Sequence, residues 1–113
     1  MGAQGTTTID FGAFPGKTDT SVAVTGQTSI AGGSLVEAWV FPVATSDHSA
    51  DEHLADPPRV MAGNIVAGTG FTIYGFVADQ ALPGGDEVDG NYTVTPTNNV
   101  RLYGQYTVAW VWN

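Results

Sequence analysis

Apolar and polar residues alternate with a period of two along most of this chain, and clusters of Gly, Pro and Asn separate the alternating runs. Such alternation is typical of β-strands, because successive side chains of a strand point to opposite faces of a sheet. The runs that we expect to form strands are Thr6–Gly12, Thr20–Thr25, Ser34–Phe41, Arg59–Val66, Thr69–Ala78, Asn91–Thr95 and Val100–Trp112. The pattern predicts an all-β fold, an antiparallel, jelly-roll-like β-sandwich of about seven to nine strands.

One segment has a helical pattern instead. Ser49 and Glu52 fit a capping box, in which a Ser side chain and a Glu three residues later satisfy backbone N–H groups at a helix start. The pair Pro57-Pro58 stops any helix before it, because proline lacks an N–H and restricts the preceding residue. We therefore expect at most one short helix, near residues 49–55. The polar groups of Asp47–His53 are expected to tie down the long connection between the two sheets.

The length and composition indicate one folded domain. A chain of 113 residues can bury one hydrophobic core, so we expect a single sandwich domain over residues 1–113. Hydrophobic residues make up 42% of the chain, which argues against disorder. Cysteine is absent, so disulfides and thiolate metal sites are excluded, and stability must come from packing or assembly.

The charge of the chain limits its partners. The formal net charge is −8, and the only basic side chains are Lys17, Arg59 and Arg101. Proteins bind nucleic acid largely by neutralising phosphates with Lys and Arg, and these scattered cations cannot form such a patch. Nucleic acid is therefore excluded as a partner. Anionic membranes are disfavoured for the same reason, and no stretch approaches the roughly 20 apolar residues of a membrane span.

No group of residues forms a catalytic or metal-binding pattern. Zinc ligands on one helix favour spacings of three or four residues, and the only histidines, His48 and His53, do not have that spacing. No Ser or Thr nucleophile has a recognisable base beside it. The acidic run Asp86–Gly90 lacks the spacing of an EF-hand and is typical of an exposed loop. We expect no enzyme activity, no cofactor and no metal, with a metal site at Asp47–His53 as the alternative.

The aromatic residues of two strands are the best candidates for a binding surface. Leu35–Phe41 and Tyr103–Trp112 are apolar on both faces, whereas a sandwich of this size has one interior. Some of these rings should therefore lie at a subunit interface, where Trp and Tyr are enriched. The interface candidates are Trp39, Phe41, Tyr106, Trp110 and Trp112. Core packing and a carbohydrate-binding platform are the alternatives for the same rings.

A series of motifs runs along most of the chain. It consists of Thr8–Gly12 (TIDFG), Ser21–Gln27 (SVAVTGQ), Val36–Val40 (VEAWV), Ser46–His53 (SDHSADEH), Ile65–Tyr74 (IVAGTGFTIY) and Val108–Trp112 (VAWVW). In these motifs the chain resembles small proteins encoded among the structural genes of tailed bacteriophages. Residues 79–99 are longer than the corresponding connection in that family, and the family supplies no catalytic motif. The resemblance implies a virion component that decorates the head or belongs to the tail.

The residues and the resemblance together lead to one functional expectation. We expect a virion structural protein of a tailed bacteriophage, a capsid decoration (cement) protein that stabilises the head through protein–protein contacts. The alternative is a tail-associated module that binds a host glycan or receptor. The expected partners are further copies of the chain, in a homo-oligomer such as a trimer, and the major capsid protein or another virion protein. The expected location is the virion, after synthesis in the host bacterial cytoplasm.

Overall fold

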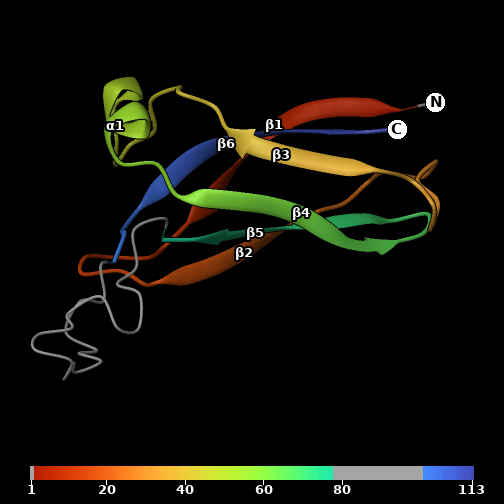
Figure 1. Cartoon of the computed structure of the whole chain (residues 1–113), viewed down its shortest axis with the longest axis horizontal. Coiled ribbons are helices and arrows are strands. Elements are labelled where there is room, and N and C mark those ends of the chain that lie inside the picture. The colour runs from red at the N-terminus through yellow and green to blue at the C-terminus, as the bar shows by residue number, and fades with distance from the viewer. Residues whose placement is uncertain (1, 78–100) are drawn as a thin grey trace, which may run out of the picture.

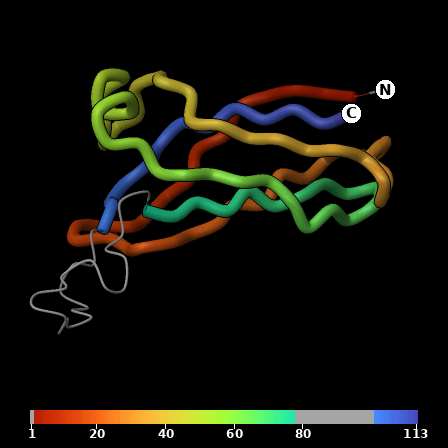
Figure 2. Tube along the Cα trace, in the orientation of Figure 1, coloured from red at the N-terminus to blue at the C-terminus, as the bar shows by residue number. Residues whose placement is uncertain are grey.

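The computed structural model describes residues 2–77 and 101–113, which form two antiparallel three-stranded sheets and one short helix. The strands are β1 (Ala3–Asp10), β2 (Asp19–Val24), β3 (Val36–Val40), β4 (Arg59–Val66), β5 (Gly70–Phe76) and β6 (Gln105–Trp112), and the helix is α1 (Ala50–Ala55). The sheets have the strand orders β1-β6-β3 and β2-β5-β4 and form the two layers of a sandwich (Figure 1). Along the edges of the sandwich, β3 lies beside β4 and β1 lies beside β2 (Figure 2).

This architecture confirms the expected all-β antiparallel sandwich and the single short helix within residues 49–55. The six described strands correspond to six of the expected runs. The remaining run, Asn91–Thr95, lies outside the described residues, as do Asp86–Gly90 and the connection 79–99. None of the described residues belongs to a helix long and apolar enough to cross a membrane.

The core lies between the sheets, and each strand contributes the apolar residues of one of its faces. Each large apolar side chain that becomes fully buried stabilises the fold by about 1.5–3 kcal/mol. The strand β6 is central in its sheet, with β1 and β3 on either side, so the large residues on its inner face are enclosed. The buried hydrophobic cluster comprises Ile9, Phe11, Val24, Ile30, Phe71, Ile73, Val77, Leu102, Tyr106, Val108, Trp110 and Trp112.

Trp110 fits into this core because its neighbours across the sheet are small. Its partners in the register are Gly5 on β1 and Ala38 on β3. A Cβ atom on Gly5 would come within 2.6 Å of the indole, closer than packed atoms can approach without a shift. The indole also packs edge-on against Phe71 of the opposite sheet, with ring centroids 5.5 Å apart. Trp110 therefore connects the two layers.

Candidate functional site

The strand β3 ends opposite Val108, whereas β6 begins at Gln105, so the first part of one edge of β6 has no strand beside it. The N–H of Phe41 donates to the Thr107 carbonyl at 2.9 Å, and the chain then leaves the sheet at Pro42, which has no N–H to continue the ladder. Backbone polar groups that are buried without a partner cost about as much free energy as a lost hydrogen bond. The backbone groups along this edge, from Thr107 back to Tyr103 just before β6, therefore need other partners.

On this edge, the backbone groups of Gln105 form hydrogen bonds with two side chains of the segment that follows β3. The Thr45 hydroxyl donates to the Gln105 carbonyl at 2.8 Å, and Oδ2 of Asp47 accepts from the Gln105 N–H at 2.8 Å. The Thr45 oxygen also accepts from the N–H groups of Asp47 and His48, each at 3.1 Å, which fixes the local turn. Side chains thus satisfy both backbone groups of Gln105 in place of a strand.

His53 supplies a further partner from the buried side of α1. Its Nε2 accepts from the Thr107 N–H at 2.9 Å, and its Nδ1 lies 2.7 Å from the Ser49 carbonyl, to which it can only donate. An imidazole that accepts at one nitrogen and donates at the other is neutral and has one fixed tautomer. Because both nitrogens are occupied, neither is free to bind a metal ion or to act as a catalytic base.

His48 completes the set of side chains along the edge. Its Nε2 donates to the Tyr103 carbonyl at 2.5 Å, and its Nδ1 lies 3.5 Å from Oε1 of Glu52. The ring stacks on Tyr106, with centroids 4.3 Å apart and planes 22° apart. His48 is buried by this packing, so both histidines of the chain are built into the fold.

The start of α1 has the complete capping box that the sequence predicts. The Ser49 hydroxyl accepts from the Glu52 N–H at 3.2 Å, and Oε1 of Glu52 accepts from the Ser49 N–H at 2.6 Å. The expected structural role of Asp47–His53, a capped turn that ties down the connection between the sheets, is confirmed. Across residues 2–77 and 101–113, no group of three or more His, Cys, Asp or Glu side chains is placed to hold a metal ion.

A hollow of about 310 Å³ lies beside Tyr106, between α1 and the residues that precede β6. Burial of the phenol, and then the negative charges of Asp56 and Glu52 and the neighbouring Tyr103, raise the pKa of Tyr106 to about 12. The phenol therefore stays protonated at neutral pH, where it can donate a hydrogen bond but cannot act as a general base. The hollow is lined by His48, Glu52, Ala55, Asp56, Arg101, Leu102, Tyr103 and Tyr106.

Exposed apolar side chains lie on the outer face of the β1-β6-β3 sheet. Leu35, Trp39 and Phe41, from β3 and its flanks, are 77, 44 and 42% exposed. The outward residues of β6 between Gln105 and Trp112 all have short side chains, so they do not cover these exposed apolar side chains. Glu37 is the only charged residue that β3 and β6 place on this face. We call this surface the β3 face.

Trp39 and Phe41 line a hollow of about 280 Å³ on the β3 face. Gln4 and Thr6 of β1 add an amide and a hydroxyl to its lining, and no charged side chain contributes to it. Binding sites of this kind use aromatic rings for contact area and a few polar groups for orientation. The hollow can receive an apolar side chain of another protein or the flat face of a neutral sugar ring.

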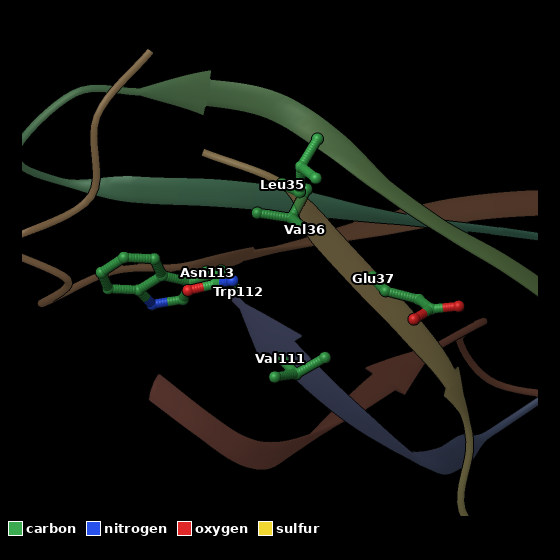
Figure 3. Close-up of a pocket in the computed structure, with 6 residues that line it drawn as sticks. All are labelled: Leu35, Val36, Glu37, Val111, Trp112 and Asn113. Carbon is green, nitrogen blue, oxygen red and sulfur yellow. The ribbon is translucent and has the colours of Figure 1, made fainter. Parts of the chain in front are cut away.

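A second hollow, of about 330 Å³, lies where β3 begins and β6 ends (Figure 3). The backbones of Leu35 and Asn113 exchange two hydrogen bonds of 3.0 and 2.9 Å, which hold these strand ends together. The side chain of Glu37 points away from Trp112 and Asn113, so the centre of this hollow is largely apolar (Figure 3). The two hollows therefore lie along β3, one where the strand begins and one where it ends.

The five residues expected at an interface divide into two groups. Trp39 and Phe41 lie on the β3 face, where a partner can reach them. Tyr106, Trp110 and Trp112 point inward and are only 2, 8 and 5% exposed, so they are core residues of this chain. The indole N–H of Trp112 donates to Oε1 of Gln27 at 2.9 Å, which satisfies its polar edge inside the fold. The interface candidates therefore narrow to Trp39 and Phe41.

No protein-family model, curated protein or solved structure matches the chain.

Proposed function

We propose that this chain is a non-catalytic structural protein of a tailed-phage virion, and that it decorates the head by binding capsid subunits through the β3 face. The observation that carries the proposal is the exposure of Trp39 and Phe41 beside Leu35, on a surface where β3 and β6 supply a single charge. Contiguous exposed apolar patches larger than roughly a few hundred Å² are rare on soluble monomers and usually mark interaction sites.

Burial of these rings gives the physical mechanism of head stabilisation. Each Å² of apolar surface removed from water contributes roughly 25 cal/mol, and aromatic residues at the centre of an interface supply most of the binding energy. A protein bound across the junction of capsomers adds such contacts at many places on the shell. The contacts oppose the outward pressure of packaged DNA without any chemical step.

The remaining features agree with this role. Only 12% of the residues are charged, and the net charge of −8 keeps the chain away from nucleic acid. Both histidines are engaged in hydrogen bonds within the fold. The resemblance of the sequence motifs to small structural proteins of tailed phages supports the same proposal.

A second candidate function is a tail-associated module that binds a host glycan. The uncharged hollow at Trp39 and Phe41 favours it, because Gln4 and Thr6 place neutral hydrogen-bonding groups beside two aromatic rings. Such a hollow can bind a neutral sugar by stacking and hydrogen bonds. This candidate function uses the same surface as the first. The two functions therefore differ in where the chain lies in the virion and in what it binds.

The test is to separate the heads and tails of the phage that encodes the chain and to quantify the chain in each fraction by mass spectrometry. The proposal predicts that the chain follows the heads, in many copies per particle. Recovery with the tails, together with binding to neutral host oligosaccharides that Trp39→Ala abolishes, would establish the second candidate. Absence of the chain from both fractions would overturn both.

A further inference from the structure

The outer face of the β2-β5-β4 sheet, on the opposite side of the sandwich from the β3 face, is also partly apolar (Figure 1). Met61 and Tyr74 are 63 and 42% exposed there, and Phe76 lies half-buried beside them. Asp19 and Arg59 are the only charged side chains that these strands place on this face. The strands therefore give this face no net charge, although the whole chain carries a net charge of −8.

The register of the sheet sets these two charges in one row. Phe76 of the central strand β5 pairs with Asp19 of β2 on one side and with Arg59 of β4 on the other. Because neighbouring strands are about 4.8 Å apart, the acid and the base are attached roughly 10 Å apart with Phe76 between them. The guanidinium of Arg59 lies over the Phe76 ring, 5.4 Å from its centroid. Neither charge forms a salt bridge with another described residue.

We propose that this face binds a second copy of the chain, in a dimer whose twofold axis lies between the two facing sheets and is parallel to β5. A half-turn about that axis reverses the row, so Asp19 of each copy lies over Arg59 of the other. Phe76 and Tyr74 then meet their own counterparts at the centre of the interface. A twofold interface uses the same patch on both partners and must therefore be complementary to itself. Sheets packed face to face lie about 10 Å apart, within the combined reach of Arg and Asp side chains.

The charges favour a second copy over other occupants. An acidic partner would leave Asp19 facing a like charge, and a basic partner would do the same to Arg59. A second copy pairs both charges at once, through a neutral face that limits the repulsion between two acidic chains. This inference does not depend on the proposed role in the phage head, because it concerns the other face of the sandwich.

The test is sedimentation equilibrium of the full chain, of Asp19→Arg, of Arg59→Asp, and of an equal mixture of the two variants. The wild type should form a reversible dimer. In each variant alone two pairs of like charges face each other, so the dissociation constant should rise by about tenfold or more. In the mixture each Arg again faces an Asp, so the heterodimer should regain wild-type affinity. A monomeric or trimeric wild type, or a mixture that fails to recover, would overturn the inference.

Glu37→Arg is the matched control for net charge. It makes the same change of charge as Asp19→Arg, but on the β3 face. The inference predicts that Glu37→Arg leaves the dissociation constant of the dimer unchanged. If Glu37→Arg weakens the dimer as much as Asp19→Arg does, the contact lies elsewhere and the assignment is wrong.

Discussion

The backbone N–H of Thr107 donates a hydrogen bond to Nε2 of His53 at 2.9 Å, although the two residues are 54 positions apart in the sequence. The bond joins α1 to the central strand β6, at the point where β3 has left the sheet. The other ring nitrogen lies 2.7 Å from the Ser49 carbonyl, so the imidazole connects the helix start to the strand. His53, in the polar segment Asp47–His53, therefore has a structural role.

Replacing His53 with Ala should lower the free energy of unfolding by about 3 kcal/mol, because it leaves a cavity and an unpaired buried N–H on Thr107. Leu54→Ala is the matched control, since Leu54 is the next residue on the same helix and its side chain is exposed. The control should change the stability by no more than about 0.5 kcal/mol. Urea unfolding measures both. Equal stabilities of the two variants would show that the hydrogen bond to Thr107 contributes nothing.

Replacing Ser49 with Ala should cost about 1 kcal/mol, because the Glu52 N–H loses its capping acceptor. The exposed Ser46, outside the helix, provides the comparison. Ser46→Ala should be neutral in the same urea unfolding experiment. A loss of the same size in both variants would mean that the capping box does not stabilise α1.

Only part of the structure of Asp47–His53 could be predicted from sequence, because some of its hydrogen bonds are local and others join residues far apart in the chain. The capping box depends on Ser49 and Glu52 alone, which are three positions apart, so local spacing was sufficient. The partners of His53 and His48 are 54 and 55 positions later in the chain, on β6 and just before it. Their backbone edge is open because β3 ends at Val40 and the chain leaves the sheet at Pro42. No local pattern carries that information.

Two tryptophans that look alike in the sequence should respond differently to truncation. Trp110→Ala should lower the free energy of unfolding by about 3–5 kcal/mol, because the indole fills the space beside Gly5 and Phe71. Trp39→Ala should cost less than about 1 kcal/mol, because the ring is 44% exposed on the β3 face. Urea unfolding of the two variants distinguishes them. Similar losses would contradict the assignment of one ring to the core and the other to the surface.

The alternation predicted which side chains share a face, but it could not say which face of β3 or β6 points inward. Both strands are apolar on both faces, so the face that points inward depends on the residues of the neighbouring strands. Trp110 lies inward because Gly5 and Ala38 leave room for it across the sheet. In β6 the outward residues are smaller than the inward ones, and this size difference was the available signal for that strand. In β3 the larger residues point outward, so size gave no guide there.

The stability of the protein should fall in alkali through the titration of Tyr106. Burial, followed by the charges of Asp56 and Glu52, raises its pKa from 10.0 to about 12. Below pH 10 the phenol is protonated in both the folded and unfolded states, so its full contribution is present. Between pH 10 and about 12 only the unfolded state loses the proton, so the free energy of unfolding decreases as pH rises.

Tyr106→Phe isolates this effect, because it removes the Tyr106 phenol and leaves every other tyrosine in place. The stability of the wild type relative to Tyr106→Phe should decrease between pH 10 and about 12 and stay constant below pH 10. Urea unfolding of both proteins across that range makes the measurement. A constant difference over the whole range would show that the pKa of Tyr106 is not raised in the folded state.

The central claim, that the β3 face binds the phage head, is tested most directly by titrating purified heads that lack this chain with wild-type protein and with Trp39→Ala. Leu54→Ala, exposed on α1 and outside both hollows along β3, serves as the control. The account predicts saturable binding of the wild type and the control, and a loss of about 2 kcal/mol or more, roughly thirtyfold in affinity, for a Trp39→Ala variant that remains folded. Equal binding of all three proteins, or no binding of the wild type, would contradict it.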